Sequence, residues 1–289
     1  MVIRGRIIRP PSEAENFLLQ VTTGCSSDNC TFCGAYADKP FSIKTYEEIV
    51  TDIETGSRMY PGIRRVFLLD GDALAVPNRR LIPVLKKLGE SFTGITRISS
   101  YVNGYNITNR SDTEIEELYT DKLRLVYIGL ESGSQKILDI CRKRSGVKEM
   151  TDAVIRMKRA GIKSSVIVLL GLGGKEHSEE HVYETVKALN RMQPRYLSLL
   201  TVMLIPGTGL WKQARRGDFE ELDSTGLLNE AYGIVKGLAL EGTVFRSNHA
   251  SNYLSIEGKL PRDRKSILDK LEKGIYGTIK LRPEYLRGL

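Results

Sequence analysis

Short apolar segments alternate with longer, more polar segments over the first two thirds of the chain. Six of them are rich in β-branched and aromatic residues and predict strands, at 17–21, 65–69, 96–100, 125–129, 165–170 and 196–203. The segments between them predict helices, at 45–60, 78–90, 112–119, 134–160 and 179–192. Strands that alternate with helices indicate βαβ units and a parallel sheet. We therefore expect an α/β fold, with its chemistry at the carboxyl ends of the strands.

The alternating pattern ends near residue 217. A helix is predicted over 221–241, followed by a polar, irregular stretch at 246–258 and a last helix around 262–275. No long linker, low-complexity block or fixed-period repeat separates this part from the rest. We expect a core at 1–217 and a mainly helical extension at 218–289 that packs on it.

Composition and charge narrow the class of protein. The 289 residues are 41% hydrophobic and 27% charged, which is typical of a globular chain that can bury a sizeable core. No apolar run approaches the ~20 residues needed to cross a bilayer, and the basic start of the chain lacks a secretory signal. A cytoplasmic protein is expected. The net charge of +8 is spread along the chain, so it indicates phosphate or nucleic-acid binding only weakly.

Three of the four cysteines fall within nine residues: Cys25, Cys30 and Cys33, whereas Cys141 lies far along the chain. Three thiolates in a loop can bind three irons of a [4Fe–4S] cluster and leave the fourth iron open to a small molecule. A structural zinc site usually has four Cys or His ligands, and no His is near in the sequence. A disulfide would leave one cysteine of the three over. The cluster therefore favours iron–sulfur binding, with zinc as the alternative.

The segment GCSSDNCTFCGAY after a predicted strand resembles the radical S-adenosylmethionine (SAM) superfamily, and the likeness extends over roughly 15–210. It implies a partial (β/α)6 TIM-like barrel and a [4Fe–4S] cluster held by the three clustered cysteines. SAM would bind the fourth iron, and its reductive cleavage would give a 5′-deoxyadenosyl radical. Phe32 would shield the cluster or pack beside the adenine. The C-x4-C-x2-C spacing has one residue more than the usual C-x3-C-x2-C.

Two further strand ends are candidates for contact with SAM. Gly71 and Asp72 fall in the place of the family's glycine-rich segment, where Asp72 would accept a hydrogen bond from the SAM ammonium. The alternative is a simple turn before a helix. Ser99 and Ser100 would face the ribose or the SAM carboxylate, with an ordinary polar loop as the alternative.

The fourth predicted strand ends in Gly129-Leu-Glu131-Ser-Gly-Ser. This segment resembles the branch with oxygen-independent coproporphyrinogen dehydrogenase, the methylthiotransferases and the Elongator-type enzymes. The resemblance implies that Glu131 contacts SAM and that Lys143, or else Arg144, reaches its carboxylate. The alternative for these two cations is a solvated helix end.

After the fifth and sixth strands the resemblance is less complete. Ile167 stands where the same branch has an Asp that binds the ribose. The turn at 206–208 resembles the family's Pro-Gly-Thr turn and makes Val202 and Met203 candidates for packing on the adenine, unless they are simply core.

Two groups of polar residues remain. His177 and His181 are four residues apart, but without the H-E-x-x-H pattern a solvated helix face is favoured over a metal pair. The stretch 245–253 is rich in hydrogen-bonding side chains, and we expect it to reach over the barrel mouth and touch the substrate, with a surface loop as the alternative. Its candidate contacts are Arg246, Asn248, His249 and Asn252.

These patterns together predict a radical SAM enzyme that binds a [4Fe–4S] cluster and SAM and abstracts hydrogen from an unidentified small molecule. The resemblance implies an external one-electron donor of the flavodoxin or ferredoxin type. A tRNA substrate stays open because of the positive charge, and no membrane partner is expected. The alternative is a non-catalytic metal-binding or nucleic-acid-binding protein that uses the three cysteines structurally.

Overall fold

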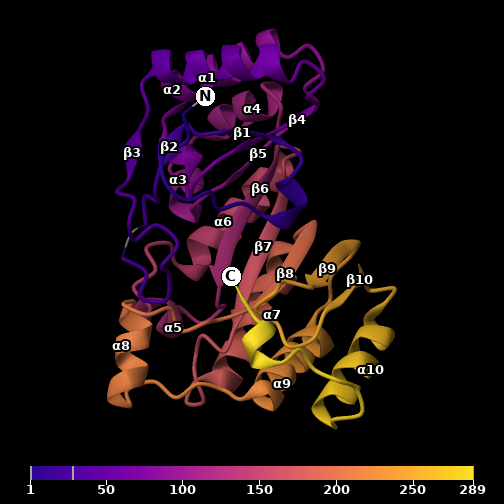
Figure 1. Cartoon of the computed structure of the whole chain (residues 1–289). Coiled ribbons are helices and arrows are strands. Elements are labelled where there is room, and N and C mark those ends of the chain that lie inside the picture. Colours follow the sequence, from indigo (N-terminus) through magenta and orange to yellow (C-terminus); the bar gives the residue numbers. More distant parts are fainter. Residues whose placement is uncertain (1, 28, 289) are drawn as a thin grey trace. The chain divides into compact units, whose positions relative to one another are not determined.

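A computed structural model describes residues 2–27 and 29–288 and divides the chain into two compact units. The first comprises 1–28, 35–128 and 152–164, and the second 29–34, 129–151 and 165–289. Each unit is an α/β arrangement in its own right (Figure 1). The cysteine loop is divided, with Cys25 in the first unit and the other two clustered cysteines in the second.

The first unit is built on parallel strands. β1 pairs with β4, β4 with β5, and β5 with β6, all parallel, while β2 and β3 form a short antiparallel pair. Its elements are the short 3-10 helix at Pro11–Glu13, β1 (Phe17–Leu19), β2 (Thr22–Thr23), β3 (Ser42–Ile43), α1 (Tyr46–Met59), β4 (Arg65–Leu68), a 3-10 turn at Ala73–Ala75, α2 (Asn78–Ser91), β5 (Arg97–Tyr101), α3 (Gly104–Thr108), α4 (Asp112–Thr120), the first part of β6 (Leu123–Glu131) and the second part of α6 (Val147–Arg159).

Helix α1 illustrates why the sequence folds in this way. Thr45 and Glu48 form a reciprocal capping box, which satisfies backbone N–H groups at the start of the helix. Ile49 and Ile53, one turn apart, are buried, as an amphipathic helix requires. Gly56 faces Phe17 of β1 so closely that a β-carbon would lie 2.2 Å from the ring. The helix can therefore lie directly on the strand.

The second unit continues the alternation and then adds a hairpin. β7 pairs with β8 and β8 with β9 in parallel, and β9 pairs with β10 antiparallel (Figure 1). Its elements are α5 (Gln135–Ile140), most of β7 (Lys163–Leu170), α7 (Ser178–Met192), β8 (Tyr196–Thr201), α8 (Gly209–Arg216), α9 (Ser224–Gly237), β9 (Thr243–Ser247), β10 (Ile256–Leu260), α10 (Arg264–Ile275) and a last 3-10 turn at Glu284–Leu286.

The α/β class predicted from the sequence is confirmed, and each of the six predicted strands overlaps a strand of the structure. The helix predicted over 134–160 is wrong in one respect, because it is two helices: Arg142 has φ 54°, a left-handed conformation that ends α5. The stretch predicted as irregular also contains two strands. In β9 the buried residues Thr243, Phe245 and Ser247 alternate with more exposed ones, which is a strand period.

The C-terminal extension is therefore helical only in part. Its helix α9 packs on α7, and glycines allow the approach: β-carbons at Gly233 and Gly237 would lie 2.9 and 2.8 Å from Val182 and Val186. The boundary at 217/218 stays a prediction. Within the described residues no helix is long and apolar enough to cross a membrane.

Candidate functional site

In the first unit, the start of the cysteine loop is held against the end of β4. A β-carbon at Gly71 would lie 2.6 Å from Cys25 Cβ and 2.7 Å from its Sγ, so only glycine fits. The Gly71 N–H donates to the Gly24 carbonyl at 2.9 Å. Gly24 itself has φ +68° and would collide with the Lys39 carbonyl if it had a side chain. These contacts fix where Cys25 leaves the sheet.

A buried ion pair fixes the far end of the same loop. Lys39 Nζ lies 2.8 Å from Asp70 Oδ1, and the two side chains are 6% and 1% exposed. Asp70 Oδ2 also accepts from Gln20 Nε2 at 2.7 Å. Breaking such a pair would leave an uncompensated buried charge. The pair therefore strongly favours the position of the loop in which the two side chains meet. The loop is thus tied to the end of β4 at both of its ends.

Asp72 is completely buried and surrounded by donors. Its carboxylate accepts from Ser26 Oγ at 2.5 Å, from the Asn103 amide nitrogen Nδ2 at 3.0 Å, and from Asn106. Burial nevertheless raises the pKa of Asp72, against these hydrogen bonds. Asp72, the predicted SAM contact, therefore holds the start of the cysteine loop in position through its bond to Ser26. Its role toward SAM stays a prediction.

Asn103 links this anchor to Cys25. Its amide nitrogen lies 3.8 Å from Cys25 Sγ and 3.1 Å from Ser26 Oγ, and the Ser27 N–H points at the same sulfur at 3.4 Å. N–H donors toward a cluster sulfur are one of the ways in which proteins tune iron–sulfur potentials. The sequence analysis missed Asn103. The sequence signal that could have revealed it is an Asn-Gly pair just after the predicted strand that ends in Ser99 and Ser100.

Ser99 and Ser100 are both fully buried on β5. Ser99 Oγ donates to Glu13 Oε2 at 3.0 Å, and Ser100 Oγ donates to the Tyr101 carbonyl at 2.8 Å. Both hydroxyls therefore have partners within the first unit. The predicted contact of either hydroxyl with SAM stays a prediction.

In the second unit, Thr31 ties down the other half of the cysteine loop. Its N–H donates to the Cys141 carbonyl at 2.9 Å, and its carbonyl accepts from the Leu210 N–H at 2.7 Å. Gly209 allows this approach, because a β-carbon there would lie 2.9 Å from Thr31 Cβ. The segment between Cys30 and Cys33 is thus clamped between the end of α5 and the start of α8.

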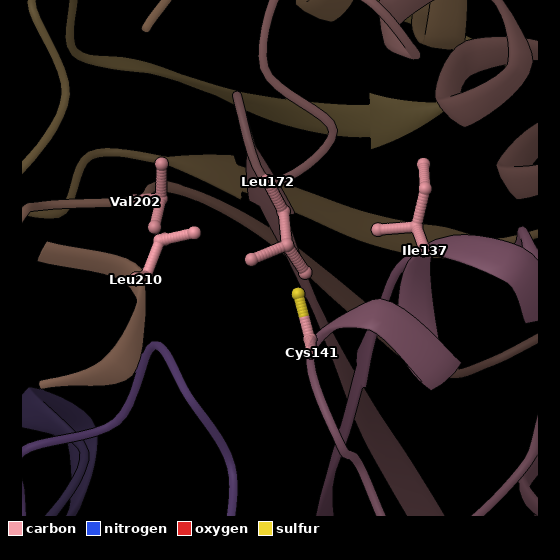
Figure 2. Packing of buried hydrophobic residues seen from close by; sticks show 5 residues of the cluster. All are labelled: Ile137, Cys141, Leu172, Val202 and Leu210. Atoms are coloured by element: carbon pink, nitrogen blue, oxygen red, sulfur yellow. The ribbon is translucent and has the colours of Figure 1, made fainter. Parts of the chain in front are cut away.

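The fourth cysteine belongs to an apolar cluster beside that clamp. Cys141 packs with Ile137, Leu172, Val202 and Leu210, and its sulfur points toward Leu172 (Figure 2). Phe32 of the cysteine loop packs against the same cluster. Burial raises the pKa of the Cys141 thiol to about 11. This cysteine is a buried thiol, and the loop is left with three cysteines as donors.

Glu131 and Lys143, predicted to contact SAM, are paired with each other. Lys143 Nζ lies 3.0 Å from Glu131 Oε1, with side chains 8% and 12% exposed. A β-carbon at Gly129 would lie 2.0 Å from that oxygen, so Gly129 makes room for the carboxylate. Glu131 has φ 62°, a conformation that non-glycine residues adopt only when the surroundings impose it. Arg144 is exposed.

Val202, the predicted adenine contact, is 7% exposed and lies at the end of β8 in the apolar cluster, whereas Met203 is half-buried. The turn that follows has Gly207 at φ 90°, and Thr208 Oγ1 then caps α8 by accepting from the Trp211 N–H. The local geometry is that of a strand-to-helix turn. No contact among the described residues tests whether Val202 or Met203 packs on the adenine.

The candidate substrate contacts near β9 differ in their surroundings. Asn252 is 3% exposed and bonded to Thr201, Leu199 and Ser247, which joins the ends of β8 and β9. Asn248 is exposed and bonded to Glu257, and Arg246 lies 5.7 Å from the Tyr196 ring. His249 is half-buried, and burial together with Arg282 lowers its pKa. Whether these four residues contact a substrate stays a prediction.

His181 corrects one expectation. It is fully buried, whereas the sequence analysis favoured a solvated helix face. Its Nδ1 contacts Ser132 Oγ at 2.9 Å and its Nε2 lies 3.9 Å from Glu230 Oε2. Glu230 of α9 accepts from the Gly171 N–H and from Ser178 Oγ, both at 2.7 Å. The sequence analysis missed this polar cluster because a fully buried Glu has no local signal.

The donor set of the cysteine loop fits an iron–sulfur cluster. The loop offers three thiols and no imidazole, Gly71 leaves space where a side chain would strike Cys25, and Cys141 is buried in the apolar cluster beside the loop. Over residues 2–27 and 29–288, no three His, Cys, Asp or Glu side chains gather as one metal ion would require. A [4Fe–4S] cube is larger than one ion and takes at most one protein thiolate on each iron, so three cysteines can serve three of its irons.

The family model of the radical SAM superfamily matches residues 19–189, and the chain belongs to that superfamily. One curated relative, an uncharacterized methyltransferase of Pyrococcus horikoshii, is 24% identical over 200 residues, which are 68% of this chain and 41% of the relative. The chain spans about two fifths of the length of the curated relatives it matches.

Solved structures with 13–16% identity show the same fold. Methylornithine synthase is matched over 93% of this chain and 83% of its own, with a TM-score of 0.54. Coproporphyrinogen III oxidase from Escherichia coli is matched over 76% and 52%, with a TM-score of 0.56. The methyltransferase TsrM from Kitasatospora setae, solved with cobalamin and a [4Fe–4S] cluster, is matched over 69% and 39%, with a TM-score of 0.54. The expected likeness to the TIM-like radical SAM fold is confirmed.

Proposed function

We propose that this chain is a radical SAM enzyme whose [4Fe–4S] cluster is held by Cys25, Cys30 and Cys33. The observation that carries the proposal is the fit of Gly71 to Cys25, which leaves no space for any other residue at the end of β4. Superfamily membership supplies the chemical context. A structural metal site is the weaker interpretation, because only three cysteines are offered and the fourth is buried in an apolar cluster.

When bound, the cluster would supply the electron for reductive cleavage of SAM to methionine and a 5′-deoxyadenosyl radical, the species that would abstract hydrogen from the substrate. The protein's own part is to bind, orient and exclude water. The charge of the Lys143 ammonium suits it to the SAM carboxylate. Glu131, which lies 3.0 Å from Lys143 at the end of β6, would contact SAM beside it. Phe32 and Val202 pack in the apolar cluster around Cys141. In this proposal Phe32 would shield the iron–sulfur cluster or pack beside the adenine, and Val202 would pack on the adenine.

The substrate in this proposal is a small molecule. An external one-electron donor of the flavodoxin or ferredoxin type supplies the electron, and the protein works in the cytoplasm. Dispersed positive charge gives no concentrated surface for tRNA, so tRNA is the less favoured substrate.

Anaerobic reconstitution with iron and sulfide tests the proposal. We expect about four irons and four sulfides per chain, and 5′-deoxyadenosine from SAM with dithionite as reductant. The variant Cys30→Ala should lose both, whereas Cys141→Ala is the matched control and should keep both. Stoichiometric zinc in natively isolated protein, with no SAM cleavage after reconstitution, would refute the proposal.

A further inference from the structure

The second unit contains a polar cavity of about 260 Å³. Of the predicted site residues, Val202 alone is among those that line it. The cavity opens beside the carboxyl ends of β7 and β8, where Gly171 and Val202 form part of its wall. The other lining residues come from the C-terminal extension: Glu221, Leu222, Leu227, Tyr253, Glu284 and Arg287. Ligand sites of α/β folds lie at this end of the strands, and the volume suits a small metabolite rather than a nucleotide or a polymer.

Three charged side chains line the cavity, and two of them, Arg287 and Glu284, pair with each other. Arg287 Nη1 lies 2.7 Å from Glu284 Oε2, its Nε donates to the Ser251 carbonyl at 2.7 Å, and its guanidinium lies 4.1 Å from the centre of the Tyr253 ring. The Tyr253 hydroxyl donates to the same carboxylate of Glu284. The one cation of the cavity is thus neutralised by one of its two carboxylates.

Glu221 is the carboxylate that remains. Among the described residues it has no hydrogen-bond or ion-pair partner, and it adds a net negative charge to the lining. The Glu221 side chain is exposed at the cavity rim. Partial burial raises its pKa, Arg287 opposes that rise, and Glu284 adds to it to a smaller extent. A bound cation would favour the charged carboxylate, because it places the opposite charge next to it.

From this geometry we propose that the cavity binds a small molecule through a primary ammonium group, with Glu221 as its counter-ion. Leu222 and Leu227 offer apolar surface to a short methylene chain, since both line the same cavity. An anionic ligand would meet two carboxylates and an arginine that is already paired. A neutral hydroxyl would bring no charge opposite to that of Glu221. The proposal rests on the proposed function, because it assigns the substrate class of that enzyme.

The part of the cavity wall at the end of β7 is closely packed. Gly171 has φ +79°, and a β-carbon there would lie 2.8 Å from Leu227 and 3.3 Å from Val202. Its N–H is held by Glu230 at 2.7 Å, which fixes the turn that ends β7. The cavity floor is therefore set by buried contacts and does not depend on the ligand.

Calorimetric titration of the reconstituted protein tests the proposal with three probes of equal chain length: cadaverine, pentanediol and glutarate. We expect cadaverine to bind at least about tenfold more tightly than the neutral or the anionic probe, a difference of about 1.4 kcal/mol. Glu221→Gln should weaken cadaverine binding by at least about tenfold. Its neighbour Glu220 pairs with Lys175 outside the cavity, so Glu220→Gln is a control with the same change of charge and should bind normally.

Equal binding of the three probes, no cadaverine binding, or the same loss in both variants would overturn the proposal. Cleavage of SAM without substrate is measured on the wild type and on Glu220→Gln and should be equal in the two. If the wild type binds cadaverine but forms no 5′-deoxyadenosine, the proposed function fails and the ammonium site stands. If it cleaves SAM but does not select cadaverine, the ammonium site fails alone.

Discussion

Gly71 and Cys25 are in such close contact that a β-carbon on the glycine would lie 2.7 Å from the cysteine sulfur. Gly71→Ala must therefore displace the first cysteine of the loop. We expect the iron content after reconstitution to fall from about four per chain to less than about half of that. Gly62→Ala is the matched control, since a β-carbon at Gly62 meets nothing within 4 Å. Full iron content in the Gly71 variant would contradict the contact.

The buried thiol should matter for stability and not for the cluster. Cys141→Ala removes a sulfur from the apolar cluster with Leu172 and Val202. We expect the free energy of unfolding to fall by about 1–2 kcal/mol, measured by urea denaturation, while the iron content is unchanged. Loss of iron in this variant would mean that Cys141 is a ligand.

The pair of Glu131 and Lys143 should act as one unit. Glu131→Gln and Lys143→Met each remove one charge of a buried ion pair, so each should weaken SAM binding by about tenfold and lower stability by about 1–3 kcal/mol. The double variant should lose less than the sum of the two. Glu184→Gln breaks the exposed pair with Lys187 and should change neither quantity. Additive losses would show that the two residues act independently.

Stability should depend on pH through the cluster of Glu230 and His181. Burial raises the pKa of Glu230 from 4.5 to about 7 and lowers the pKa of His181 from 6.5 to about 4. The folded state holds the Glu230 proton more tightly, so this contribution is complete below pH 4.5 and is lost as the pH rises through about 7. His181 acts in the opposite sense and costs stability as the pH falls from 6.5 through about 4.

Glu230→Gln separates the two effects. The variant resembles the protonated acid and should gain up to about 3 kcal/mol over the wild type between pH 5 and pH 8. The wild type itself should vary little between pH 4.5 and 6.5, because the two groups oppose each other there. Urea denaturation across this range is the measurement. A difference between variant and wild type that does not change with pH would contradict the assignment.

Variants of Asn252 and His249 should separate an effect on stability from an effect on catalysis. Asn252→Ala removes three buried hydrogen bonds between the ends of β8 and β9, and we expect a loss of about 2–3 kcal/mol in the free energy of unfolding. His249→Ala should leave stability within about 1 kcal/mol. If the predicted substrate contact is real, this variant still forms 5′-deoxyadenosine from SAM but no longer transfers hydrogen from the substrate. Unchanged substrate turnover would remove His249 from the site.

Local periodicity accounts for what could be predicted. Each strand and most helices carry their own signal, because the side chains that must be buried repeat with the period of the element. The hairpin of β9 and β10 also had such a signal, although the polar residues around it concealed it. The cysteine loop could be recognised because all of its thiols lie within nine residues.

The sequence by itself determined the α/β class, the positions of six strands along the chain and the three-cysteine loop. Only the tertiary structure decided that Thr31 is clamped to Cys141, that Asp72 anchors Ser26 and Asn103, and that Glu230 lies buried beside His181. These partners are 31 to 110 residues apart along the chain. Their pairing follows from which faces of the helices and strands come together when the chain folds. No local pattern of residues reveals it, because the partners are far apart in the sequence.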